Sequence, residues 1–203
     1  MFARRSALAS SIPAASDKHA CLPANVLICE RHPVSLLQIS AFAATISETE
    51  HALCTALGLQ APAANQLSGD STLSLRSVGP GVWQVFGDVL HSPQADQLRA
   101  ILKGIASVVD LSHGRTALLV SGLCAAKTLA KFCGLDLQPD KFMTGSSTQT
   151  RFGHIAMTLS RIDDAPTFEI LVFRGYAQHV FESLVEGAAE FGLRVNGQSA
   201  LNA

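Results

Sequence analysis

The densest group of side chains capable of acid–base or nucleophilic chemistry lies near the middle of the chain, where Asp110, Ser112 and His113 occur together. These are the residue types of a serine nucleophile with its base and its orienting carboxylate. On an extended strand, Asp110 and Ser112 share one face, whereas His113 points to the other. No G-x-S-x-G turn is present to expose a nucleophilic serine. We therefore predict a buried hydrogen-bond cluster that fixes the strand crossing, and no catalytic triad.

Residue types that could hold a metal or a cofactor are scattered along the chain. The seven histidines form no H-E-x-x-H or comparable pair. The five cysteines form no C-x-x-C pair, and we expect small buried hydrophobes in a reducing compartment. Neither a dinucleotide-binding glycine motif nor a P-loop occurs. The sequence therefore predicts no catalytic, cofactor-binding or metal-binding residue in this chain.

Composition points to a partner protein. Of the 203 residues, 48% are hydrophobic and only 15% are charged, against about 25% charged in ordinary soluble domains. The shortage of charge indicates that a partner covers part of the surface. The net charge is -1 and basic residues form no patch, so we predict no nucleic-acid partner. No apolar stretch reaches the roughly 18 to 20 residues that span a bilayer, so we predict no membrane insertion.

The chain ends are expected to be tails. The first residues carry two arginines and no acid before Asp17, as in transit peptides, but no apolar stretch long enough for secretion. We predict a disordered tail over residues 1–24, a short tail over 196–203, and a cytoplasmic protein.

Hydrophobic periodicity predicts the same order of elements twice: strand, helix, strand, strand, helix. A capping box at residues 47–50 marks the first helix, and Ser92 with Pro93 marks the second. The predicted strands cover residues 34–42, 72–78, 82–86, 116–120, 155–162 and 168–173, and the other helices cover 123–133 and 176–191. Each pass is typical of a split βαβ, ferredoxin-like unit. We predict an α+β fold over residues 25–195, with two ferredoxin-like halves, about 25–108 and 109–195, packed together.

Several motifs, in order along the chain, resemble the folate-binding domain of the aminomethyltransferase superfamily. The first is a Gly-Pro turn before a tryptophan, at residues 79–83. The second is a D-x-S strand followed by a second strand and a glycine turn, at 109–122. The third is a glycine turn before a strand, at 153–155. Within this superfamily the chain resembles the sarcosine oxidase gamma subunit family, through its size, the D-x-S-H-G-R-T run at 110–116 and the P-T-F-E strand at 166–169. The resemblance covers about residues 25 to 193.

This resemblance implies a heterotetrameric oxidase of alpha, beta, gamma and delta chains. FAD, FMN, NAD, tetrahydrofolate and zinc would be held by the other subunits and none by this chain. Folate-dependent relatives share a G-x-x-x-D-D run, but the matching positions here are Gly153, Met157 and Thr158, which supply no carboxylate. Two alternatives remain open: a stand-alone folate-binding transferase or iron–sulfur assembly factor of the same fold, and the equivalent small subunit of an N-methylglutamate dehydrogenase.

Three residues are candidates for contact with a partner chain. Trp83 lies beside a Gly-Pro turn, and Phe142 and Met143 lie in a long connection, residues 135–147, outside any periodic pattern. The alternative is that both segments fold back on the core of this chain.

Overall fold

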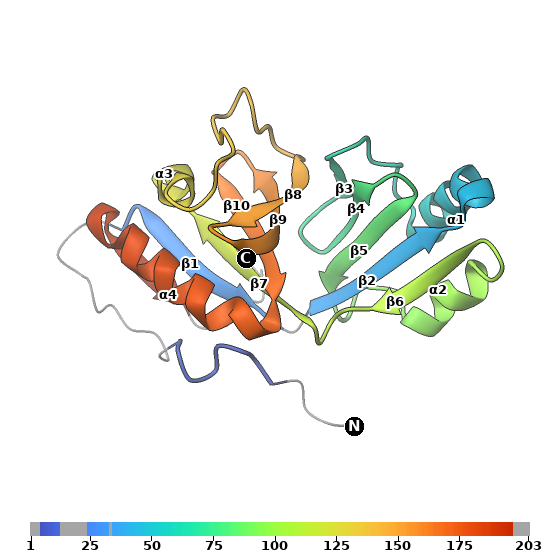
Figure 1. The fold of residues 1–203 in the computed structure, drawn as a ribbon, viewed down its shortest axis with the longest axis horizontal. Helices are drawn as coiled ribbons and strands as arrows, with labels where there is room; N and C mark the ends of the chain where they lie inside the picture. The colour runs from blue at the N-terminus through green and yellow to red at the C-terminus, as the bar shows by residue number, and fades with distance from the viewer. Residues whose placement is uncertain (1–4, 13–23, 33, 197–203) are drawn as a thin grey trace. The chain divides into compact units, whose positions relative to one another are not determined.

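The computed structural model describes residues 5–12, 24–32 and 34–196. The chain divides into two compact units: unit 1 is Met1–His32 with Gly114–Ala203, and unit 2 is Pro33–His113. Each unit contains one β-sheet and its own helices (Figure 1). The prediction of an α+β fold is therefore confirmed.

Unit 2 has the ferredoxin-like order of elements. Its strands lie in the order β3-β4-β5-β2-β6, and all neighbours are antiparallel. Its elements are β2 (Val34–Ala41), a 3-10 turn (Ala43–Thr45), α1 (Ile46–Leu57), β3 (Leu67–Gly69), β4 (Leu73–Gly79), β5 (Val82–Asp88), α2 (Ala95–Ile101) and β6 (Ala106–Asp110). Leu37 and Ile39, which share one face of β2, pack with Val85 against Leu53 of α1 and Leu98 of α2. This apolar layer explains why both helices cover the same face of the sheet.

Both helix starts that were predicted from capping residues in unit 2 are wrong. Helix α1 begins one residue before Ser47, which therefore lies inside its first turn. Helix α2 begins three residues after Ser92, and Gln94 and Gln97 form the reciprocal capping box instead. The backbone N–H of Ser92 donates to the carbonyl of Asp88, so Ser92 belongs to the turn that follows β5.

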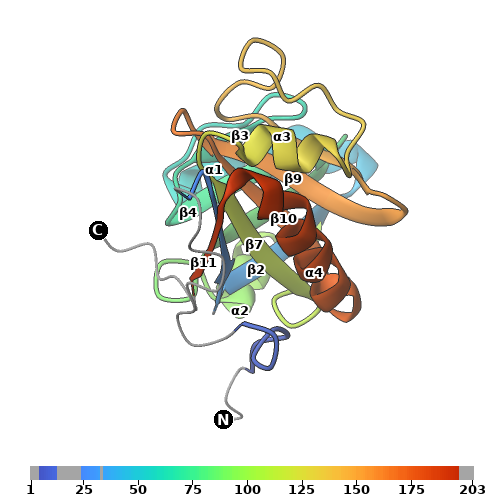
Figure 2. The same cartoon turned by 90° about the vertical axis from the view of Figure 1, so that its left-hand side faces the viewer.

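Unit 1 contains a six-stranded sheet in the order β11-β1-β7-β10-β9-β8. Its elements are β1 (Val26–Arg31), β7 (Arg115–Ser121), α3 (Ala125–Ala130), β8 (Ser147–Phe152), β9 (Ile155–Asp163), β10 (Thr167–Phe173), a 3-10 turn (Arg174–Tyr176), α4 (Ala177–Ala188), a second 3-10 turn (Ala189–Phe191) and β11 (Leu193–Asn196). Figure 2 shows α4 lying along this sheet. Its buried Val180 and Leu184 pack with Leu129 of α3 and with Leu118 and Ile170 of the sheet.

The predicted first half, residues 25–108, differs from unit 2, because the first strand belongs to unit 1. Strand β1 lies between β11 and β7, parallel to the former and antiparallel to the latter. Its side chains Val26 and Ile28 belong to the core of unit 1. The N-terminal strand is thus inserted into the unit built mainly from C-terminal residues, and the other unit begins only at Pro33.

The expected disordered tail is also corrected, for residues 5–12. Leu8 is fully buried in the core of unit 1. The hydroxyl of Ser6 donates to the carboxylate of Glu30, which is itself buried. The remaining tail residues, 1–4, 13–23 and 197–203, lie outside the described part of the chain.

Candidate functional site

The Asp110–Ser112–His113 group holds two strands together. The Ser112 hydroxyl oxygen accepts a hydrogen bond from the backbone N–H of Leu36, at 3.0 Å. A carboxylate oxygen of Asp110 accepts the backbone N–H of Ser112, at 2.9 Å. His113 is exposed, as is Asp110. The predicted hydrogen bonds of Asp110 and Ser112 are present, but the prediction that the cluster is buried is wrong, because Asp110 and His113 are exposed.

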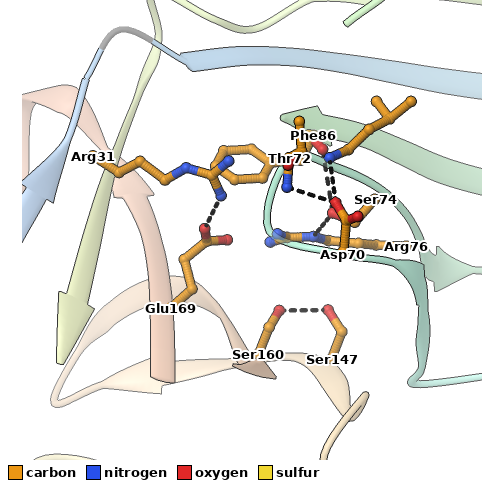
Figure 3. Close-up of polar contacts among 10 residues, drawn as sticks. Arg31, Asp70, Thr72, Ser74, Arg76, Phe86, Ser147, Ser160 and Glu169 are labelled. Atoms are coloured by element: carbon orange, nitrogen blue, oxygen red, sulfur yellow. Dashed lines mark hydrogen bonds and ion pairs between the residues drawn. The ribbon is translucent and has the colours of Figure 1, made fainter. Parts of the chain in front are cut away.

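A buried ion pair crosses the sheet of unit 1 (Figure 3). One guanidinium nitrogen of Arg31 donates to a carboxylate oxygen of Glu169 at 2.8 Å, and the side chains are 3% and 0% exposed. Strands β1 and β10 both pair with β7, so the two side chains meet across that strand. Since the two buried charges neutralise each other, the pair has the features of a structural element and not of a substrate site.

The positions that would carry a folate-orienting carboxylate are apolar or hydroxylic and are buried. Met157 is 3% exposed and belongs to the core, and Thr158 is 7% exposed. Close by, the hydroxyls of Ser147 and Ser160 form a 2.8 Å hydrogen bond between β8 and β9 (Figure 3). Met157 and Thr158 therefore supply no carboxylate at the positions where the resemblance to folate-dependent proteins would place one.

Unit 2 has its own buried polar group. The guanidinium carbon of Arg76, a residue only 1% exposed, lies 4.3 Å from the centre of the Phe86 ring, within the range of a cation–π contact. The Arg76 Nε donates to the hydroxyl of Ser74 at 3.3 Å (Figure 3). At the turn before β4, a carboxylate oxygen of Asp70 accepts the backbone N–H of Thr72 at 2.7 Å.

The four cysteines within the described residues are free thiols. Cys29 and Cys133 are buried, while Cys54 and Cys124 are half-buried, so the expectation that the cysteines are buried holds for two of these four. Cys21 lies outside the described residues. No group of three histidine, cysteine or carboxylate side chains lies together anywhere in the described ranges. Likewise, within those ranges, no helix is both long and apolar enough to cross a bilayer.

Cys54 allows a test by pH. Burial, and to a smaller extent the negative charge of Glu50, raises the pKa of its thiol above the usual value. Because the thiolate is the reactive form, a raised pKa means less thiolate at any pH below that pKa. We expect alkylation of Cys54 by iodoacetamide, followed by peptide mass spectrometry, to be slow at about pH 8 and to accelerate only above the usual thiol pKa of about 8.5. Glu50→Gln should speed the reaction at about pH 8; an unchanged rate would contradict the contribution of the carboxylate.

The three candidate contact residues differ in how far their side chains are exposed. Trp83 is 3% exposed within the core of unit 2 and lines a hollow of about 460 Å³ beside the start of α1. Phe142 is 7% exposed, and its ring stacks on Phe168, with centres 6.4 Å apart. The Phe142 side chain therefore belongs to the core of unit 1, in agreement with the alternative that this segment folds back on the core. Met143, the next residue, is 57% exposed.

Comparison with known proteins decides the family. The family model described as sarcosine oxidase, gamma subunit family, matches residues 40–190, which is most of the chain. The chain belongs to the sarcosine oxidase gamma subunit family. One curated relative, sarcosine oxidase subunit gamma from Corynebacterium sp. (strain U-96), is 29% identical over 147 residues, covering 69% of each protein.

Solved structures agree with this membership of the sarcosine oxidase gamma subunit family. A chain in heterotetrameric sarcosine oxidase from Corynebacterium sp. U-96, in complex with pyrrole 2-carboxylate, superposes with a TM-score of 0.80 at 25% identity, covering 98% of this chain and 99% of that one. The glycine cleavage system aminomethyltransferase T from Bartonella henselae shares the fold, with a TM-score of 0.63 at 17% identity. The match covers 92% of this chain but only 53% of the aminomethyltransferase.

One feature of this gamma-subunit homologue was not predicted: an apolar hollow in unit 1, beside α3. The sequence contains a signal for it, because Ala126 and Ala130 lie four positions apart and therefore one above the other on a helix. Small side chains at such positions leave room against the helix, but only the tertiary structure shows that Pro139 and Pro166 line the same hollow.

Proposed function

We propose that this chain is the gamma subunit of a heterotetrameric sarcosine oxidase, where it contributes to assembly and carries no active site of its own. The observation that supports this most strongly is the superposition over nearly the whole length of both chains. The proposed partners are alpha, beta and delta subunits, and the proposed location is the cytoplasm.

In the proposed complex the chemistry belongs to the other subunits. Sarcosine loses two electrons and two protons to oxygen, giving hydrogen peroxide, while its N-methyl carbon passes to tetrahydrofolate and leaves glycine. FAD, FMN, NAD, tetrahydrofolate and zinc are proposed for the other chains. The buried Met157 and Thr158 support the absence of folate chemistry here, since neither side chain can replace a carboxylate.

The role proposed for this chain requires a stable interface of more than about 1,200 Å². Of the three candidate contact residues, Met143 alone keeps its side chain largely exposed. The low proportion of charged residues, 15%, is consistent with a surface that is partly covered in the complex.

Co-expression of the four subunits with a tag on this chain tests the proposal. We expect the other three chains to co-purify with it and the complex to oxidise sarcosine with release of hydrogen peroxide. The separately purified chain should show no flavin absorbance, no zinc by elemental analysis and no saturable binding of tetrahydrofolate by calorimetry. Assembly of the active oxidase without this chain, or stoichiometric flavin or folate on it, would refute the assignment.

A further inference from the structure

The hollow in unit 1 is a groove of about 480 Å³ between α3 and the connection that follows it. Ala126 and Ala130 line the groove from α3, Pro139 and Pro166 line it from two connections, and the fully buried Phe168 completes the lining. Prolines have fixed backbone φ angles and no N–H donor, so the walls are stiff as well as apolar. Such a groove is shaped before any ligand arrives, which lowers the entropy cost of binding.

The rim of the groove exposes a large apolar side chain. Leu123, which lines the groove immediately before α3, is 80% exposed. An exposed leucine that continues an apolar hollow gives one contiguous apolar surface, and surfaces of this kind with a polar rim mark sites of interaction. A small ligand confined to the hollow would leave Leu123 in water, whereas a segment of polypeptide crossing the rim would cover it.

One side chain lining the groove brings a positive charge into this apolar setting. Arg161 is 4% exposed. Its guanidinium donates to the carbonyl of Phe142 at 2.9 Å, to the carbonyl of Asp163 at 3.2 Å and to the carboxylate of Asp164 at 3.4 Å. A guanidinium has five N–H groups, so two have no acceptor among the described residues. Asp164 is a weak counter-charge, because its side chain is 89% exposed and the same oxygen accepts the hydroxyl of Thr144.

The other two charges of the groove lining are opposite in sign. Lys127 of α3 also lines it and is exposed, so its ammonium lies on the solvent side. The single acidic residue of the lining is Asp136, whose carboxylate accepts the backbone N–H of Gln138 at 3.1 Å. Lys127 and Asp136 therefore balance each other, and the weakly paired Arg161, with two N–H groups lacking an acceptor, favours an anionic group in the groove.

We propose that this groove binds an apolar segment of a partner subunit, with a carboxylate of that segment placed at Arg161. The inference rests on the proposed function, because the partner is a subunit of the proposed oxidase. The apolar side chains of the segment fill the space between α3 and the two prolines, and cover Leu123. The carboxylate accepts the two remaining N–H groups of the guanidinium, a charge-assisted contact that gains strength where water is excluded.

Photo-crosslinking in the assembled complex tests the proposal directly. The photoreactive residue p-benzoylphenylalanine is placed at position 123, the four subunits are co-expressed, and the crosslinked peptide is identified by mass spectrometry. We expect a crosslink to a partner subunit, in a peptide with apolar residues next to Asp or Glu. The matched control carries the same residue at Leu90, which is 92% exposed in unit 2 and outside the groove, and should not crosslink to that peptide. Failure of position 123 to crosslink to any partner would overturn the proposal.

Charge placed at the rim gives an independent measurement. Leu123→Asp should leave the thermal unfolding of the chain nearly unchanged, because the side chain is exposed, but lower recovery of the partner subunits about tenfold or more. Lys127→Glu should lower recovery as well, and more so at low salt. Leu90→Asp and Lys103→Glu, in unit 2, serve as matched controls and should assemble normally.

The outcomes separate this proposal from the proposed function. If the wild-type chain recovers the partners and Leu123→Asp recovers them equally, the groove proposal fails and the subunit assignment stands. If the wild-type chain recovers no partner, both fail. If decanoate, as a probe of small apolar carboxylates, binds the wild-type chain in calorimetry while Leu123→Asp assembles normally, the groove is a small-molecule site and the docking proposal is overturned.

Discussion

Replacing Glu169 with alanine is expected to lower the free energy of unfolding by about 3 to 5 kcal/mol. The carboxylate is fully buried and accepts a 2.8 Å hydrogen bond from Arg31, itself 3% exposed. Without it, the charge of the guanidinium stays in a medium of low dielectric constant and loses its counter-charge at that contact. Urea unfolding of the full chain, followed by far-UV circular dichroism, measures the loss.

Two matched variants give the control for this pair. Asp96→Ala removes the carboxylate of the exposed Arg99–Asp96 pair, whose atoms are 2.7 Å apart, and should cost at most about 1 kcal/mol because water screens it. Replacing both Arg31 and Glu169 with Met and Leu should cost less than Glu169→Ala alone, since no charge is then left behind. A double variant less stable than the single one would show that the pair contributes net stability.

The adjacent pair Phe142 and Met143 should respond to aspartate in opposite ways. Phe142→Asp is expected to cost more than about 3 kcal/mol, because it removes a buried aromatic ring and inserts a charge in its place. Met143→Asp should change stability by no more than about 0.5 kcal/mol, because the side chain is 57% exposed. Thermal and urea unfolding of the two variants, prepared in parallel, measure the difference.

Each variant is also the other's control, because the two substitutions introduce the same residue at adjacent positions of the chain. Folded Phe142→Asp protein with normal stability would contradict the packing of this ring on Phe168. If Met143→Asp folds normally but no longer recovers the partner subunits, Met143 contributes to the interface. If it recovers them fully, the proposal of a contact at Met143 fails.

The elements with strong local patterns were predicted well. The strands predicted at 155–162 and 168–173 correspond to β9 and β10, and the helix predicted at 176–191 corresponds to α4 with its flanking 3-10 turns. In these segments, alternation or 3.6-residue periodicity reports which side chains face the core. Hydrophobic periodicity did not predict β1, β3, β8 or β11. Strands β3 and β11 have only three and four residues, too few for a periodic signal.

The motifs of the chain also predicted its family, because short runs such as residues 110–116 combine several residue types at fixed spacing. The same motifs did not predict which candidate residues are exposed. Phe142 lies in a connection with no periodicity, where sequence does not distinguish an exposed ring from a buried one, and only its packing on Phe168 decides. The start of α2 was predicted wrongly for a similar reason. Several polar residues before this helix are suitable caps, but Ser92 is held in the preceding turn and Gln94 is the residue that caps the helix.

The sequence by itself determined the α+β class, the repeated order of elements and the absence of a recognisable catalytic motif, because these depend on local periodicity and spacing. The tertiary structure alone decided that β1 joins the sheet of unit 1, that Arg31 and Glu169 meet across β7, and that Arg161 lines an apolar groove. Each of these depends on contacts between residues far apart in the chain, such as the 138 positions that separate Arg31 from Glu169. Strand pairing and burial set the energies of such contacts, and no local pattern of residues encodes them.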